Sequence, residues 1–256
     1  MRSSLLPRLL PLVALLLAAA SARADNLDRD TLLTDAPAVA EKGTVRITGS
    51  GGGQQNADGG STGGTGTVSG SIQWTPLANV SGDVGAYYQA GNSGPSARVR
   101  YQLLKQSDFG VDLSGGVRFK SLSFQRAAPG TADHGEIEFL IAAGRRFGQW
   151  DVVLNGAFGA ELGGGGGKDL EVKSFAGYRF TDAVRAGIDF RLQAEVGDGE
   201  ATTAPKVGRD FDLTTGPAVS WMVTKNFQLQ ALVGAAAPKN TVKTVPVGVL
   251  AASIDF

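Results

Sequence analysis

Ten charged residues lie on one side of a series of alternating segments, and they define the chemistry that the chain could perform. On each segment they occupy positions opposite to the apolar side chains. The ten are Arg98, Arg100, Arg118, Lys120, Glu136, Glu138, Asp151, Arg185, Asp189 and Arg191. A lone buried ion costs several kcal/mol, so charges this numerous must pair with one another or line water. We therefore predict a polar lumen with these ten residues as its pore lining.

The two signs of charge are separated along the chain. Residues 98–120 supply a basic cluster, and residues 136–161 supply an acidic one. One interpretation is a transverse field across a pore that orients polar solutes. The other is a salt-bridged interior that stiffens a narrow barrel and conducts little. Both interpretations stay open, because about 12 strands fall between filled eight-stranded barrels and open porins of 16 to 18. The mixed charge predicts no ion selectivity.

Residues suited to catalysis are few. His134 is the only histidine. The nearby Ser121 and Ser123 are expected to face outward and His134 inward, which disfavours a hydrogen bond between a serine nucleophile and a histidine base. Cys is absent, and one His cannot anchor a transition metal. The glycine run that ends at Lys168 is followed by Asp169, where a phosphate loop needs Ser or Thr. We expect no enzyme, no metal and no cofactor.

The charged residues need strands to position them. In Val184–Val196 every even residue is apolar, and every odd residue is charged, Gln or Gly. A period of two is typical of a strand with one apolar face. We count about 12 such strands of roughly 9 to 14 residues, the length of a tilted membrane strand. The sequence predicts an all-β, closed, antiparallel, up-and-down transmembrane β-barrel, with 10 or 14 strands as alternatives.

The connections between the predicted strands alternate in length. Those after even-numbered strands are brief, such as 148–149 and 181–182, and those after odd-numbered strands are longer and richer in glycine, such as 51–64 and 197–208. Outer-membrane barrels have short periplasmic turns and longer external loops. This alternation is the strongest argument for a membrane barrel, because a soluble sandwich has no reason to sort its connections.

Aromatic residues mark the two ends of the predicted apolar faces. They would form two girdles at the membrane interfaces, with an aliphatic band between them. The predicted girdle residues are Trp74, Tyr88, Phe109, Phe119, Trp150, Phe158, Phe180, Trp221, Phe227 and Phe256. Two residues disturb the pattern. Arg145 has outward parity beside a turn, and Pro217 within the tenth strand predicts a bulge or local irregularity.

The chain begins with an expected leader. Residues 1–24 combine a basic start, an apolar core and an Ala22-Arg23-Ala24 cleavage pattern, which indicate a secretory signal peptide. Residues 25–42 follow as a short periplasmic N-terminal segment, too small for a plug domain, which we expect to be a tether. Residues 43–256 form the barrel. Without the three leader arginines, 21 basic residues face 24 acidic ones, which gives no reason to expect a nucleic-acid partner.

The last strand carries a resemblance to a known group of proteins. Val245–Phe256 alternates and ends on an aromatic residue. It resembles the closing strand of bacterial outer-membrane β-barrel proteins, and the resemblance extends over Gly43–Phe256. It implies a place in the outer membrane, contact with outer-membrane lipid and folding by the barrel insertion machinery. Few outward polar residues predict a monomer.

The predicted function follows from the lumen. We expect a porin-like passive channel for small polar solutes. The alternative is a non-conducting structural or surface-interaction barrel with functional external loops. An outer-membrane lipase or protease is a distant third.

Overall fold

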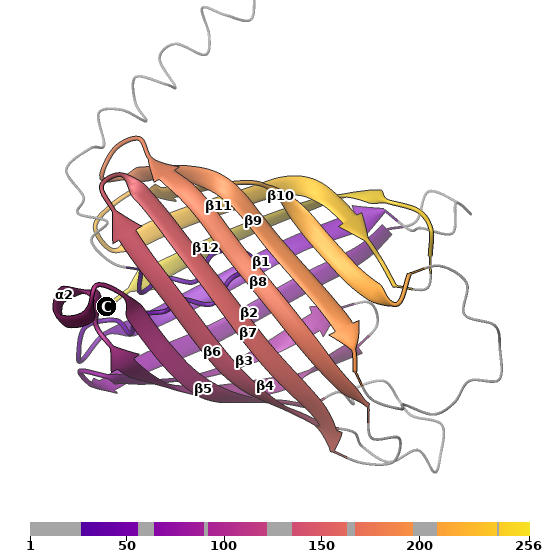
Figure 1. Cartoon of the computed structure of the whole chain (residues 1–256), viewed down its shortest axis with the longest axis horizontal. Helices are drawn as coiled ribbons and strands as arrows, with labels where there is room; N and C mark the ends of the chain where they lie inside the picture. Colours follow the sequence, from indigo (N-terminus) through magenta and orange to yellow (C-terminus); the bar gives the residue numbers. More distant parts are fainter. Residues whose placement is uncertain are drawn as a thin grey trace, which may run out of the picture.

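A computed structural model describes residues 27–55, 64–89, 92–121, 135–162, 167–196, 209–239 and 241–256. Twelve strands in these residues form a closed antiparallel barrel in which each strand pairs with its neighbours in sequence (Figure 1). The strands are β1 Val45–Gln55, β2 Gly64–Leu77, β3 Val80–Gln89, β4 Asn92–Leu104, β5 Asp112–Ser121, β6 Gly135–Phe147, β7 Trp150–Leu162, β8 Lys168–Arg179, β9 Val184–Glu195, β10 Phe211–Met222, β11 Phe227–Ala237 and β12 Val245–Asp255. The predicted fold class is confirmed, with 12 strands.

The first and last strands close the barrel. β12 pairs with β1 from Arg46↔Asp255 to Gln54↔Val247. The backbone of Phe256 exchanges two hydrogen bonds with that of Val45, at 2.8 and 3.2 Å. No strand edge is therefore left without a partner along this seam, as a membrane barrel requires.

The two faces of the sheet differ as the strand parity predicts. On β9, Ile188 is 53% exposed on the outside, whereas the next residue, Asp189, is 0% exposed. Outward Val, Leu, Ile and aromatic side chains are exposed around the barrel. A soluble protein rarely exposes so continuous an apolar surface, but lipid requires one. No helix in the described part of the chain is long and apolar enough to cross a membrane.

The short connections gather at one end of the barrel, the left end in Figure 1, together with the C-terminus. They include 78–79, 148–149 and 180–183. Gly148 makes the two-residue turn with a φ of 59°, a left-handed conformation that suits glycine. We call this end the turn end. The longer connections include residues 56–63, 122–134 and 197–208, which lie outside the described residues.

Two positions that the sequence analysis singled out depart from regular strand structure. Phe109, predicted as a girdle residue at the end of a strand, instead ends the one-turn helix α2 (Gln106–Phe109), because its N–H bonds to the Lys105 carbonyl and Gly110 then turns left-handed. Pro217 was predicted to cause a bulge or local irregularity, and the irregularity is confirmed, without a bulge. The ladder from β10 to β11 is interrupted between Thr215 and Ala218, and its register is the same on both sides. A missing N–H removes a ladder bond without demanding an extra residue. Register shifts occur instead on β2 and β4.

Most of the predicted girdle aromatics lie on the exposed exterior, and the exceptions are on β10 and β11. The exposed ones are Trp74, Tyr88, Phe109, Phe119, Trp150, Phe158, Phe180 and Phe256. Trp221 and Phe227 are half-buried, and Trp221 packs beside the buried Met222 and Ala183. Arg145 is exposed next to a turn, where its charge can reach the interface. A role for these aromatics at the membrane interface remains a prediction.

Candidate functional site

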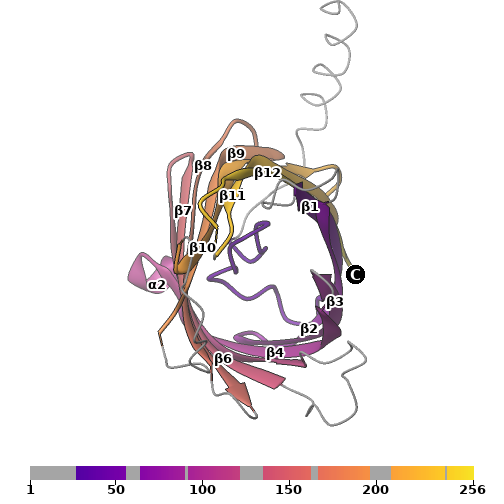
Figure 2. The ribbon, with the colours of Figure 1, turned by 90° about the vertical axis from the view of Figure 1, so that its right-hand side faces the viewer.

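The barrel lumen contains residues 27–42, which we call the inner segment. Viewed along the barrel, its indigo trace lies within the ring of strands (Figure 2). Its residues Leu27, Thr34, Ala36 and Ala40 are 2–3% exposed. The expectation that this stretch is a tether is therefore wrong for residues 27–42. It has no regular periodicity, so only contacts with distant strands determine its place.

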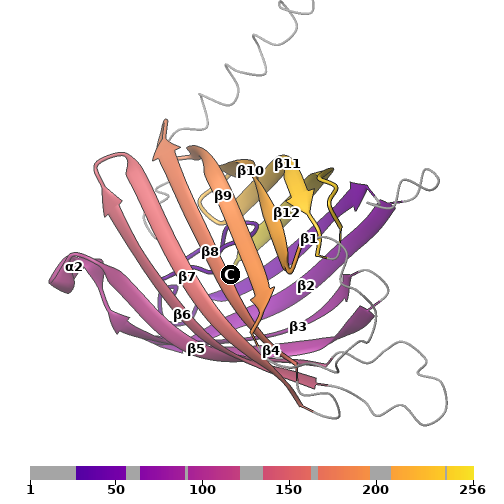
Figure 3. The ribbon, with the colours of Figure 1, turned by 45° about the vertical axis from the view of Figure 1, so that its right-hand side comes forward.

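Both ends of the inner segment are held at the turn end. Arg46 on β1 donates to the Asp28 carbonyl at 2.6 Å and to the Asp255 carboxylate at 2.7 Å, and Arg29 bonds to Asp255 as well. At the other end, the Gly43 N–H donates to the Thr75 carbonyl at 2.8 Å. The segment thus enters the lumen and returns at the same end, with its middle further inside (Figure 3).

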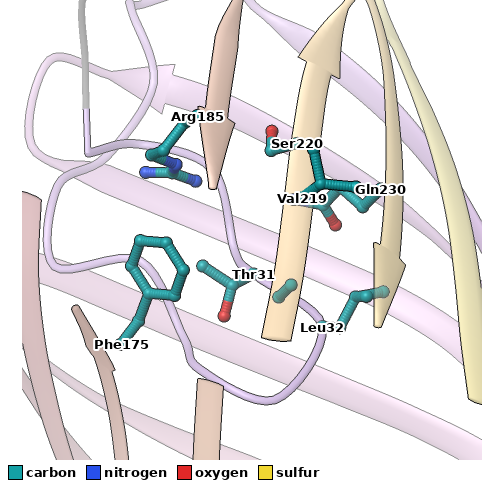
Figure 4. A pocket seen from close by; sticks show the side chains of 8 residues that line it. Thr31, Leu32, Phe175, Arg185, Val219, Ser220 and Gln230 are labelled. Carbon is teal, nitrogen blue, oxygen red and sulfur yellow. The ribbon is translucent and has the colours of Figure 1, made fainter. Parts of the chain in front are cut away.

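An apolar cluster packs the inner segment against the wall. Leu27 joins the inward side chains of Val153, Phe175, Ala218 and Leu232, all of which are buried. Close packing continues beside Gly144, where an added Cβ would meet the Pro37 ring at 2.5 Å. A cavity of about 10 Å³ separates Thr31 and Leu32 from Phe175 and Gln230 (Figure 4). That is space for about one water molecule, so the contact is tight.

The Asp189 carboxylate binds the inner segment through hydrogen bonds. It accepts from the hydroxyls of Thr31 and Thr34, both at 2.6 Å, and from the Leu33 N–H at 3.0 Å. Three donors satisfy a carboxylate that is fully removed from solvent. The predicted pore-lining residue Asp189 therefore faces the lumen, where it anchors the segment.

A network of ion pairs surrounds the middle of the segment. Arg98 binds Asp83 of β3 at 2.7 Å, Asp30 at 2.9 Å and Asp35. Arg100 donates to the Asp30 carboxylate at 3.3 Å, and it also bonds to the Ala36 carbonyl. The basic cluster predicted on the fourth and fifth strands thus meets two acidic residues that the sequence analysis did not select.

The network extends towards the loop end along neighbouring strands. Asp35 binds Lys173 at 3.1 Å and lies 4.0 Å from Arg118. The remaining pairs are formed by strand residues alone, across neighbouring strands or, for Lys173 and Glu171, within β8. They are Arg118–Glu138, Lys120–Glu138, Lys120–Glu136, Lys173–Glu171 and Arg191–Glu171. All the charges in the network are buried or half-buried, apart from the more exposed Asp30, so the network is a connected polar interior.

A second group of charges lies nearer the turn end. Asp151, fully buried, binds Arg146 at 2.7 Å and Arg185 at 3.3 Å, and Arg179 lies 3.6 Å away. The Arg185 guanidinium also stands 4.8 Å from the centre of the Phe175 ring. The ten predicted pore-lining residues therefore divide into the network around Asp35, the group around Asp151, and Asp189.

Two carboxylates of the inner segment, Asp30 and Asp35, lie among cations. Burial raises the pKa of Asp30, but the guanidinium groups of Arg98 and Arg100 outweigh burial and lower that pKa to about 2. Burial also opposes ionisation of Asp35, yet Lys173 and Arg98 hold its pKa well below the usual value. Both groups carry their negative charge at neutral pH.

Interior residues that the sequence analysis did not use would have pointed to the inner segment. Val153, Phe175 and Leu232 have inward parity and are apolar, in a lumen expected to be polar. Apolar side chains that face a lumen are expected to pack against other apolar groups. Asn155 is a further contact, since it exchanges hydrogen bonds of 2.7 and 3.0 Å with the Asp35 backbone.

A cavity of about 510 Å³ opens between the inner segment and the turn end. It is lined by residues 38–42 of the segment and by Gln102, Lys105, Asp112 and Arg146. Its mixture of both charges gives it no clear ligand preference. It forms a vestibule beneath the inner segment.

The predicted catalytic alternative cannot be assembled from the described residues. Ser121 ends β5, and its carbonyl accepts a bond from the Tyr87 hydroxyl at 2.7 Å. Ser123 and His134 lie outside the described residues, as does the predicted signal peptide 1–24.

The fold can be compared with known proteins. The sequence matches no protein-family model, and no curated protein matches it. The structure is similar to that of the NanC porin, with a TM-score of 0.59, 5% identity and coverage of 81% of this chain and 98% of that chain. It is also similar to the structure of the KdgM porin in complex with disordered oligogalacturonate. That comparison has a TM-score of 0.57 and 13% identity, and it covers 82% of this chain and 99% of that chain. A third similar structure is that of an outer membrane channel from Pseudomonas putida F1. Its TM-score is 0.56 and its identity is 13%, with coverage of 86% of this chain and 97% of that chain.

At these identities the likeness concerns the fold. The chain shares its closed antiparallel β-barrel fold with these outer-membrane proteins. Its apolar exterior fits the location in a bacterial outer membrane and the contact with lipid that the sequence predicts.

Proposed function

We propose that the chain is a porin-like passive channel for small polar solutes and that the inner segment sets its permeability. One observation carries the proposal. The wall of the lumen is a network of paired charges, and the described occupant of that lumen is a segment outside the sheet. The segment can leave without breaking a strand ladder, because the twelve strands close the barrel by themselves. The proposed channel performs no covalent chemistry.

The docked segment also favours the second candidate, a closed structural barrel. Its apolar contacts and its bonds to Asp189 fill the section of lumen between the vestibule and the ion-pair network. The two candidates differ in one property, which is whether the barrel conducts once the segment has moved.

Planar-bilayer recordings distinguish the two candidates. The mature full-length chain should give brief or small openings, whereas a variant lacking residues 27–42 should conduct steadily and more strongly. Heat-dependent gel mobility in detergent checks that each variant is a folded barrel. A folded, inserted deletion variant that never conducts would overturn the channel and favour the structural barrel.

Two further proposals concern partners. We infer that the chain inserts through the outer-membrane barrel machinery and works as a monomer, since its exterior is apolar over its lipid-facing surface. Light scattering of the detergent-solubilised barrel tests the monomer.

A further inference from the structure

Two of the carboxylates in the ion-pair network come from the inner segment. In the described residues the strands bring six cations and four carboxylates to the network, and the segment adds Asp30 and Asp35. The cations are Arg98, Arg100, Arg118, Lys120, Lys173 and Arg191, and the strand carboxylates are Asp83, Glu136, Glu138 and Glu171. Removal of the segment therefore takes two of the six ion-paired carboxylates away from these six cations.

The two segment carboxylates share one guanidinium group. Arg98 Nη2 donates to Asp30 at 2.9 Å, and Arg98 Nη1 donates to Asp35. A planar guanidinium presents its donors side by side, so the two carboxylates must lie close together. This arrangement matches two acidic groups on one short molecule better than two distant charges on a long one.

Arg100 has hydrogen-bonding capacity that the segment leaves unused. It is 2% exposed, and its Nε and Nη2 have no hydrogen-bond partner among the residues that the structure describes. Its one carboxylate partner in the described residues is Asp30, at the long distance of 3.3 Å. A buried cation with free donors is costly unless an anion or water satisfies it. The site can therefore bind an anion more completely than the segment does.

We propose that Arg98, Arg100, Arg118 and Lys173 form a binding site for short dicarboxylates and that Asp30 and Asp35 occupy it as an internal ligand. The proposal deepens the channel function and rests on it, because a solute must be able to reach the lumen. A dicarboxylate restores the two negative charges that the wall loses when the segment leaves. The inner segment and the solute then exclude each other from the same cations.

The anion binds only the released state and so shifts the equilibrium towards it. The released population grows by a factor of 1 + [L]/Kd, where L is the free anion. The tethered segment competes at a high effective concentration, so only an anion that engages several of the four cations can displace it. Monocarboxylates, with one acidic group, should displace it far less.

The chain contains no cysteine, which allows one reporter to be placed without background. Ala36→Cys puts a thiol on a residue that is 2% exposed, and Ala38→Cys is a second reporter if the first fails to fold. The rate of maleimide labelling of the full mature chain in detergent then measures release of the segment. Succinate is the probe, and acetate at equal ionic strength is its control.

Succinate at ten times its dissociation constant should raise the labelling rate about tenfold, and acetate should leave it nearly unchanged. Arg98→Gln combined with Arg100→Gln should abolish the response to succinate, although the segment itself becomes looser. Arg185→Gln is the matched control and should keep the response, because Arg185 pairs with Asp151 in the separate group.

Equal effects of succinate and acetate would overturn the dicarboxylate site, as would a response that survives loss of Arg98 and Arg100. The labelling readout requires no conduction. If the barrel responds to succinate but never conducts, the dicarboxylate site is supported and the channel function is rejected. If the barrel conducts but does not respond to succinate, the channel function is supported and the dicarboxylate site is rejected.

Discussion

Thr34 and Asp189, which are 155 residues apart in sequence, form a buried hydrogen bond of 2.6 Å between the inner segment and β9. Thr34 is 2% exposed and Asp189 is 0% exposed. The bond joins a segment without regular secondary structure to the middle of a strand. Because water does not reach either group, the bond contributes to docking more than an exposed contact would.

Thr34→Val should weaken the docking of the segment. The change keeps the side-chain shape and removes one of the three bonds to Asp189, a loss of about 1–3 kcal/mol for a hydrogen bond to a charged group. Labelling of Ala36→Cys should rise about tenfold. A double-mutant cycle with Asp189→Asn measures the coupling between the two residues. Additive effects would mean that the bond is not the source of the change.

Gly144→Ala should displace the inner segment without altering any charge. The new methyl group would stand 2.5 Å from the Pro37 ring and 3.2 Å from Leu27, and overpacking of this kind costs about 1–3 kcal/mol. Faster labelling of Ala36→Cys and a larger conductance are expected. Gly156→Ala on β7 is the control, because its methyl would make an ordinary 3.4 Å contact with Ile141. If both variants label at the wild-type rate, the packing at Gly144 does not hold the segment.

Asp30→Asn combined with Asp35→Asn should make the channel select anions. The double change removes two negative charges from the network, whether or not the segment stays docked. Reversal potentials in a salt gradient measure the selectivity, which should move towards the anion and weaken at high salt. Asp28→Asn is the control, because Asp28 pairs with Arg46 outside the network. An unchanged reversal potential in the double variant would show that the network does not line the conducting path.

Removal of Phe256 should reduce assembly more than it changes the lumen. Phe256 is 69% exposed on the outside, and its backbone makes the last two bonds of the seam with Val45. The fraction of heat-modifiable barrel in outer-membrane preparations measures assembly. Phe109→Ala is the control. Phe109 is 65% exposed and ends α2, which lies at the turn end in Figure 1 and across the barrel from the C-terminus in Figure 2. Equal assembly of both variants would count against an insertion signal in the closing strand.

The barrel could be predicted because its determinants are local. Each strand carries its own alternation, as at Ile188 and Asp189, where neighbouring residues face lipid and lumen. The length of a strand and the brevity of a turn are also properties of a few consecutive residues, such as Gly148. Strand number and pairing order then follow from counting, since up-and-down barrels pair neighbours in sequence.

The contents of the lumen could not be predicted in the same way. Residues 27–42 have no period, and their place depends on Asp189, Arg98 and Phe175, which are more than 60 residues away. Strand parity says that Arg98 points inward but not which acid it meets. The apolar inward residues Val153 and Phe175 were the available signal. They indicate that an apolar segment packs against them inside the lumen, but they do not identify which segment.

The position of Asp255 has a consequence for the order of assembly. This residue of the last strand binds Arg46 of the first strand and Arg29 of the inner segment. Arg29 and Asp255 are 226 residues apart in sequence, so this anchor does not exist until β12 has reached β1. The inner segment therefore gains this ion pair only when the wall of the barrel is complete. A barrel that has not closed would lack the contact that holds the segment at the turn end.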